Sequence, residues 1–437
     1  MKFFFIKYSI IFLLLFTAGS FVACKKDYID PSRATEDKVF TSPSGLTAVS
    51  IGLQRVYSLG RGGTLYNIVS TNGLVTKELH VLNPGNLAEF QLETGGTSVD
   101  GTNTMLAGLW ATCNKVVYDA DKVIAGAQAL ADKAYASGII GYATIFKALS
   151  IGDMSMMWEK VPDGTGTNVN FIARADGFNK AITAINDALA AISANAISAT
   201  FLANIPVGVD IINTLNALKA RYSLFTANYS QALAAANAVD LTKKSTMNFI
   251  GADLNPIFDV AGSNFNVYQP VDSTLGLPAG IQPSLTDKRV PFYVVLSGAA
   301  AWRWVMKGFC SSATSAFPIY LPGEITLIKA ECYARQTSPD LNNALTELNK
   351  VVTKLRSADP FGVGAEEPPI VGSPTQTQIL DQIYRHRCIE LYMSGLKLED
   401  MRRFGRPNSE RSRNLMPYPF RERDNNPNLA SIPDPVF

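Results

Sequence analysis

The sequence predicts a mainly α-helical chain of degenerate tetratricopeptide-like helix pairs that form a right-handed superhelical scaffold, with loop-rich segments and short β-hairpin insertions. Three observations support this prediction. Apolar residues recur at helical spacing through most of the 437 residues. Short turns separate several of these helical stretches, which favours antiparallel pairs. Two other segments, about 61–101 and 242–316, are rich in Gly, Asn, Ser and Thr, which is typical of loops.

The first half of the chain contains most of the predicted helices. They cover about 34–59, 105–131, 138–158 and 176–192, and two more lie within 214–241. One narrow apolar seam, with steps of four, three, four and three, is formed by Phe178, Ile182, Ile185, Leu189 and Ile192. Only residues 226–228 separate the last two helices, so we expect them to pack antiparallel. Residues 61–101 are expected to form loops with brief strands.

Helical spacing disappears at residue 242 and returns at 323. Within the gap, two β-like runs flank Gly298 and predict a hairpin over 289–309. A helix from 323 should carry an ion pair between Glu331 and Arg335, and Ser338 is expected to cap the next helix. Residues 358–377 are predicted to form a loop, and residues 378–403 are predicted to form the last long helix. The polar tail from Pro407 must then be held by docking on the body.

The N-terminal segment predicts export and a lipid anchor. Lys2 and Lys7 accompany a short apolar run, which is followed by small residues and then by Cys24. The run is too short for a spanning helix, which needs about 20 uncharged apolar residues. The sequence before Cys24 resembles a bacterial lipobox. We therefore expect removal of residues 1–23, acylation of the Cys24 thiol, and one domain over 24–437; a plain signal peptide with an incidental cysteine is the alternative.

Composition and motifs exclude several classes of function. The net charge of +2 falls to zero without Lys2 and Lys7, so the chain has no global attraction for nucleic acid. Two histidines disfavour a multi-histidine metal site. No H-E-x-x-H, G-x-S-x-G or Walker motif is present, and we predict no catalytic residue, metal or cofactor. Buried free thiols are expected at the four cysteines that follow Cys24: Cys113, Cys310, Cys332 and Cys388.

Candidate ligand-binding residues lie in the two loop-rich segments, because loops on a rigid scaffold commonly carry function. Trp302 and Trp304 flank Arg303 and would share one face of a strand. Such rings suit stacking on sugars; core positions beneath a hairpin are the alternative. Weaker stacking or hydrogen-bonding candidates are Tyr66, His80, Asn83, Asn86, Glu89, Tyr268 and Tyr293.

Other conspicuous residues have structural interpretations. Trp110 and Trp158 lie in helical patterns and are expected in the core. Arg387 and Glu390 are three residues apart and are interpreted as a structural, buried charge pair. The charged run at 287–289 is interpreted as a solvated turn.

Several segments, in a fixed order, resemble the SusD/RagB family of nutrient-binding outer-membrane lipoproteins. Residues 384–395, YRHRCIELYMSG, are similar to the terminal helix of the family, with His386 and Ser394 in place of two usual glutamates. The DMRR stretch at 400–403 resembles the Asp-Leu-x-Arg element that follows. Residues 323–331 and 344–349 resemble a helix pair of the family, and 418–419 and 426–429 resemble its terminal proline-containing elements.

This resemblance implies a non-enzymatic lipoprotein on the outer membrane, facing the cell exterior. It would bind a nutrient glycan and pass it to a SusC-like TonB-dependent transporter. A peptide ligand is an alternative within the family. A protein-binding helix-repeat scaffold without a small ligand, and a surface glycan hydrolase, are alternatives from other classes. The identity of the glycan does not carry over, because the binding residues of the family lie on divergent loops.

Overall fold

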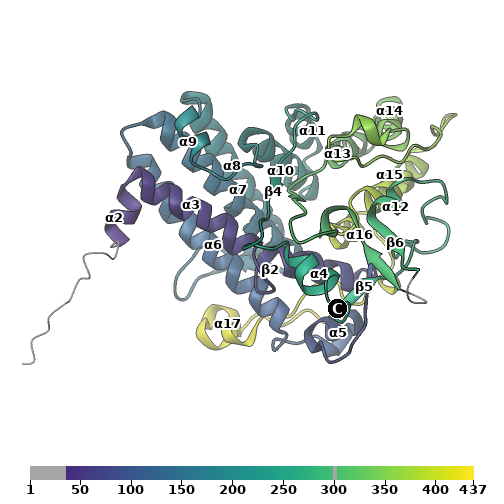
Figure 1. Ribbon diagram of the computed structural model, residues 1–437, viewed down its shortest axis with the longest axis horizontal. Coiled ribbons are helices and arrows are strands. Elements are labelled where there is room, and N and C mark those ends of the chain that lie inside the picture. The colour runs from purple at the N-terminus through teal and green to yellow at the C-terminus, as the bar shows by residue number, and fades with distance from the viewer. Residues whose placement is uncertain (1–35, 299–302) are drawn as a thin grey trace, which may run out of the picture. The chain divides into compact units, whose positions relative to one another are not determined.

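The computed structural model describes residues 36–298 and 303–437, and most of its elements are helices (Figure 1). The longer helices are α3 (Pro43–Ser58), α4 (Thr64–Val75), α6 (Thr104–Ala129), α7 (Lys133–Met157), α8 (Arg174–Ala194), α10 (Ile211–Phe225), α11 (Tyr229–Asn237), α13 (Pro322–Arg335), α14 (Leu341–Val352) and α15 (Gln376–Glu390). The shorter ones include α2 (Glu36–Thr41), α5 (Leu87–Thr94), α9 (Ala199–Ala203), α12 (Arg289–Tyr293), α16 (Lys397–Arg403), α17 (Phe420–Asn425) and α18 (Pro427–Ala430).

Helices that follow one another in the chain pack against one another. The series runs α6–α7–α8–α10–α11–α13–α14, and α15 returns to α13. Figure 1 shows α6, α7 and α8 side by side, and α11, α13 and α14 continuing the stack. Polar caps begin several of these helices, for example Asn103 on α6 and Asp132 on α7. The predicted mainly α-helical fold of helix pairs is therefore confirmed.

Helix α7 lies at the centre of this packing. It is long and apolar enough to cross a membrane, alone among the helices of the described residues, but 83% of its most apolar window is buried inside the fold. Small residues on α7 allow neighbouring helices to approach closely. A methyl group at Gly152 would overlap the ring of Tyr222 on α10. We conclude that α7 is the core helix of the stack.

Within residues 36–298 and 303–437, four two-stranded antiparallel ladders interrupt the helices. The strands are β1 (Leu79–Val81), β2 (Lys160–Pro162), β3 (Phe171–Ala173), β4 (Thr246–Met247), β5 (Tyr268–Pro270), β6 (Val294–Leu296), β7 (Trp304–Met306) and β8 (Phe317–Pro318). They pair as β1–β5, β2–β3, β4–β8 and β6–β7. The β6–β7 pairing confirms the predicted hairpin, although residues 289–293 before it form α12 instead of strand.

The structure corrects three predictions of secondary structure. Residues 64–75, expected to be loop, form α4, every residue of which is buried. The last long helix is two helices, because the chain turns between α15 and α16, where Met393 and Gly395 have positive φ angles of 59° and 80°. Asp340, not Ser338, caps α14 by accepting a hydrogen bond from the Asn343 amide.

The C-terminal tail docks on the N-terminal end of α6 and the C-terminal end of α7, and docking of the tail on the body was predicted. Met416 and Tyr418 are fully buried. The Trp158 Nε1 donates to the Pro417 carbonyl at 2.9 Å. Trp110 and Trp158 pack edge to face with ring centroids 4.8 Å apart, which confirms both as core residues. The four cysteines that the structure describes are all buried and free, also as predicted.

Candidate functional site

Three chain segments from the two predicted loop regions meet at one surface. Strand β1 pairs antiparallel with β5, with Val81 opposite Tyr268. Strand β5 in turn lies beside β7. We call the surface formed by residues 80–90, 263–268 and 303–305 the β1/β5/β7 face. Figure 1 shows β5 and β6 next to each other, on the opposite side of the fold from α8 and α9.

Side-chain amides gather on this face. Asn83 Nδ2 donates to Asn266 Oδ1 at 3.1 Å, and Asn86 Nδ2 donates to the Asn266 carbonyl at 3.0 Å. Asn83 Oδ1 also accepts from the Gly85 amide. Asn83 and Asn266 are exposed. These contacts hold the two loops together and fix the orientation of the amides, which can donate to and accept from sugar hydroxyls.

Aromatic rings lie on the same face. Phe265 is 44% exposed and Phe90 is 39% exposed. Trp304, at the start of β7, is half-buried. The Arg303 guanidinium lies over the Phe265 ring, 3.8 Å from its centroid. Phe265 and Phe90 were not predicted from the sequence; the signal was an apolar residue within the otherwise polar stretch 263–266.

The three tyrosine candidates lie behind this face and not on it. Tyr66, Tyr268 and Tyr293 are at most 3% exposed. Tyr66 and Tyr268 stack on each other, and their hydroxyls bond to Glu89 and Ser70. Burial raises the pKa of all three phenols. A ring without an exposed face cannot stack on a sugar, so we remove the three tyrosines from the candidate set. Glu89 is buried in the same layer.

His80 lines a cavity next to the face. The cavity has a volume of about 810 Å³, within the range of small-molecule sites. Leu74, Leu79 and Leu277 form its apolar part. The His80 Nδ1 lies 2.7 Å from Glu93 Oε1, and the second oxygen of Glu93 accepts from the Val81 amide. Of the sequence candidates, His80, Asn83, Asn86 and Trp304 therefore retain exposed surface in one neighbourhood.

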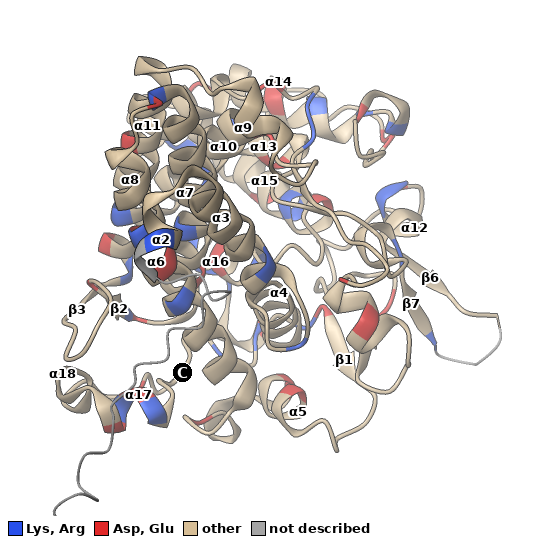
Figure 2. Cartoon of the chain, turned by 60° about the vertical axis from the view of Figure 1, so that its left-hand side comes forward, with Lys and Arg blue, Asp and Glu red and all other residues tan. Residues whose placement is uncertain are grey.

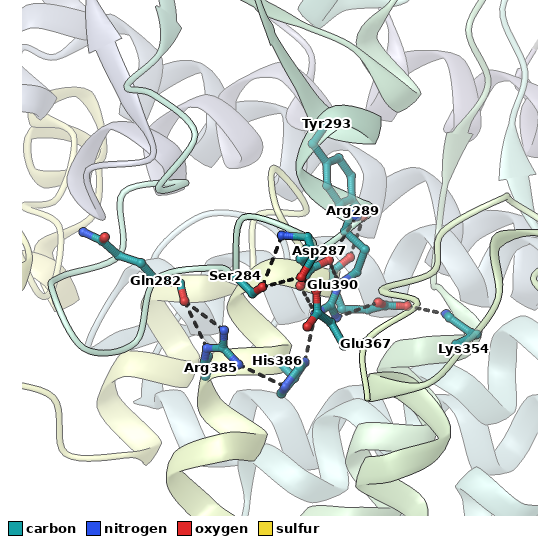
Figure 3. A network of polar contacts seen from close by, with 11 residues as sticks. Gln282, Ser284, Asp287, Arg289, Tyr293, Lys354, Glu367, Arg385, His386 and Glu390 are labelled. Carbon is teal, nitrogen blue, oxygen red and sulfur yellow. Dashed lines mark hydrogen bonds and ion pairs between the residues drawn. The ribbon is translucent and has the colours of Figure 1, made fainter. Parts of the chain in front are cut away.

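A buried network of charges holds the hairpin that carries β7 (Figure 3). Arg289 on α12 is completely buried, and its guanidinium binds Asp287 through two hydrogen bonds, at 2.7 and 3.0 Å. It also donates to Glu390 Oε2 at 3.1 Å, while Lys354 lies 2.5 Å from the other oxygen of Glu390. Tyr293 Oη donates to the Glu390 carbonyl at 2.5 Å. The network ties the start of β6 to α15.

This network corrects two sequence interpretations. Residues 287–289 are not a solvated turn, since Asp287 and Arg289 are buried. Arg387 and Glu390 are buried charges, as predicted, but each has another partner: Arg387 binds Asp400 at 2.8 Å, and Glu390 binds Arg289 and Lys354. Burial would lower the pKa of Arg289, but hydrogen bonds from it to Asp287 and the charges of Asp287 and Glu390 raise it.

Comparison with known proteins gave structural matches only. No family model and no curated protein matches the sequence. A SusD-like carbohydrate binding protein from Bacteroides fragilis superimposes with a TM-score of 0.69, at 15% identity, over 90% of this chain and 99% of that one. A SusD superfamily protein from Parabacteroides distasonis gives 0.68 at 14% identity, over 91% and 98%. One from Bacteroides thetaiotaomicron gives 0.67 at 14%, over 89% and 98%.

This chain has the SusD fold. The fold predicted by the terminal motifs is thereby confirmed over about nine-tenths of the chain. In this SusD fold, the YRHRCIELYMSG stretch forms the second half of α15 and the turn after it, and DMRR forms most of α16. Arg387 on α15 binds Asp400 on α16, so two of these motif residues join the two helices. They shape the scaffold and do not line the β1/β5/β7 face.

Two predicted residues lie outside the described part of this SusD fold: Cys24 and Trp302. Among the residues that the structure does describe, no group of three or more His, Cys, Asp or Glu side chains is arranged to hold a metal ion. In the view of Figure 2, basic and acidic residues are interspersed over the helices, with no extended region of one sign. Ligand recognition at the β1/β5/β7 face therefore depends on the side chains of that face and not on an extended charged surface.

Proposed function

We propose that this protein is a cell-surface lipoprotein that binds a nutrient glycan and passes it to a SusC-like TonB-dependent transporter. The observation that carries glycan binding is the β1/β5/β7 face, where exposed rings, oriented amides and a guanidinium share one surface. Rings cover the apolar faces of sugars, and amides bond to their hydroxyls. The likeness of the fold to a SusD-like carbohydrate binding protein supports this proposal.

The affinity expected for such a face can be estimated. A fully buried ring covers about 150–250 Å², worth roughly 4–6 kcal/mol at about 25 cal/mol/Å². A sugar covers one face only, and ordering opposes binding, so about 1–2 kcal/mol per ring remains. Micromolar affinity requires about 8 kcal/mol. Phe265, Phe90 and Trp304 together with the three amides form a set of sufficient size.

A glycan array followed by calorimetry tests this assignment. The purified protein is screened on the array, and its strongest ligand is titrated into the wild type and Phe265→Ala. We expect Phe265→Ala to weaken binding about 5- to 30-fold, the equivalent of about 1–2 kcal/mol. Phe420→Ala on α17 is the matched control, because Phe420 is 45% exposed and lies outside the face. Equal affinity of Phe265→Ala and wild type would remove the ring from the site.

The anchor is tested separately. Intact-mass spectrometry of protein from native membranes should show cleavage before Cys24 and added acyl chains. Cys24→Ser should carry no acyl chain and should retain residues 1–23, because both steps depend on the Cys24 thiol. An unmodified Cys24 thiol in a freely secreted protein would contradict the lipoprotein proposal.

The partner and the absence of catalysis have their own tests. A TonB-dependent barrel should copurify with affinity-tagged protein after mild detergent extraction. A stable complex with another protein, without glycan or transporter, would favour the scaffold alternative, and selective binding of peptides would favour the peptide-binding one. Release of reducing ends from the array ligand by the pure protein would contradict a non-enzymatic role.

A further inference from the structure

The guanidinium of Arg303 donates no hydrogen bond to a described residue, whereas the other arginines with buried, unpartnered nitrogens, such as Arg387 and Arg411, each donate at least one. The Nε and Nη2 atoms of Arg303 are buried and have no hydrogen-bond partner among the described residues. By contrast, Arg221 binds Glu324 through two hydrogen bonds of 2.6 and 2.7 Å, and Arg289 binds both Asp287 and Glu390. The carboxylates of the β1/β5/β7 face and its cavity are already engaged: Glu89 binds Arg61 and Glu93 contacts His80. Among the residues that the structure describes, Arg303 is thus left without an anionic partner.

The two unpartnered atoms of Arg303 define a recognition geometry. Nε and Nη2 form one edge of the planar guanidinium, and their two N–H groups point in parallel. This edge matches the two oxygens of a carboxylate. A buried donor without an acceptor is costly, and two such donors in one group add to the cost. A ligand that supplies both acceptors recovers this free energy and is favoured over one that supplies none.

The surroundings of Arg303 hold its plane in place. The guanidinium stacks on Phe265, with 3.8 Å between its central carbon and the ring centroid. The backbone of Arg303 is fixed on the other side, where its carbonyl accepts from the Ser297 amide at 2.7 Å. Phe265 also precedes Asn266, whose side chain bonds to Asn83. A ligand on Phe265 and the amides therefore lies close to the Arg303 guanidinium.

We propose that the ligand of this face carries a carboxylate, so that the bound glycan contains a uronic acid or another acidic sugar, and that Arg303 is the residue that selects it. This inference rests on the proposed glycan-binding function and narrows it to one substrate class. The carboxylate takes the place of the atoms that now cover Nε and Nη2 of Arg303. Its two oxygens accept hydrogen bonds from these two nitrogens.

Matched acidic and neutral glycans test the selection. The probes are oligogalacturonate, alginate and chondroitin fragments, each paired with its carboxyl-reduced form, in which the acid is a primary alcohol. We expect at least one acidic probe to bind tenfold or more tightly than its reduced partner. Binding confined to neutral glycans, or equal affinity within every pair, overturns the inference and leaves the proposed function intact. Failure to bind any glycan, acidic or neutral, overturns both.

Variants of Arg303 assign the preference to this side chain. Arg303→Gln removes the charge and the edge, and Arg303→Lys keeps the charge without the edge. We expect Arg303→Gln to abolish the preference for the acidic probe, and Arg303→Lys to retain only a small part of it, while the affinity for the reduced probe stays within twofold. Arg421→Gln, at an exposed position on α17, is the control. Full preference in Arg303→Gln, with an unchanged melting temperature, would overturn the assignment.

Discussion

The buried carboxyl of Glu78, next to β1 of the binding face, allows a test of how burial of a charge affects stability. It precedes β1, and its side chain is 1% exposed. One carboxyl oxygen, Oε1, has no hydrogen-bond partner among the described residues. Burial raises the pKa of this carboxyl to about 7, although Lys397 and the Met393 amide oppose the shift. We predict that Glu78→Gln stabilises the protein at alkaline pH.

The sign and size of the effect follow from linkage. The pKa of Glu78 is higher in the folded state than its ordinary value of 4.5. The folded state therefore binds the proton more tightly, and this stabilisation is full below about pH 4.5 and is lost as the pH rises through about 7. The difference corresponds to about 3 kcal/mol at about 1.4 kcal/mol per pH unit. About 2 kcal/mol of it falls between about pH 5.5 and pH 8.

Urea denaturation at these two pH values, followed by far-ultraviolet circular dichroism, measures the prediction. The free energy of unfolding of Glu78→Gln minus that of the wild type should be about 2 kcal/mol larger at about pH 8 than at about pH 5.5. The variant is then the relatively more stable protein at the higher pH. Asp424→Asn, at an exposed position on α17, is the control and should show no such difference. A Glu78→Gln variant whose relative stability is the same at both pH values would refute the reasoning.

Three further predictions concern the scaffold. Gly152→Ala should lower the free energy of unfolding, measured by urea denaturation, by about 1–3 kcal/mol because its methyl group meets a packed ring. Gly52→Ala in α3, with open space around it, should raise that free energy by about 0.5–1 kcal/mol. The reverse order would contradict the packing. Arg289→Met should cost about 3–5 kcal/mol because it leaves buried carboxylates, against at most about 1 kcal/mol for Arg356→Met in an exposed pair; equal losses would argue against the buried network. The four described cysteines should react with a thiol reagent only after denaturant is added, since all are buried; rapid labelling of the native protein would show otherwise.

A helix with one buried face and one polar face could be predicted from the period of its apolar residues. Helix α8 has apolar residues on one side and polar ones on the other, so its sequence carries the helical period. Helix α4 is buried on every side, and polar residues such as Asn72 are satisfied inside, where Asn72 donates to the Gly395 carbonyl. Helix α4 therefore has no polar face, and its periodicity did not identify it.

The segments of the candidate site could be predicted from the sequence, but only some of its side chains could. The sequence placed function in the two loop-rich stretches, and β1, β5 and β7 do bring them together. Which residues of a short strand face outward depends on its register, and the register depends on a partner almost 200 residues away. Tyr268 was therefore counted as a candidate although it faces inward. The prediction of a solvated turn at 287–289 is wrong because Arg289 is paired with Glu390, which lies about 100 residues further along the chain.

The docking of the tail on Trp158 has a consequence for biosynthesis. Residues 416–418 cover the ends of α6 and α7, and Trp158 at the end of α7 is made about 260 residues earlier. During translation those two tryptophan-bearing helices remain without their cover until nearly the whole polypeptide has left the ribosome. A nascent chain in that condition exposes apolar surface that chaperones and proteases bind. A nonsense mutation directly before residue 416 should therefore lower the amount of protein in the cell far more than the few missing residues suggest.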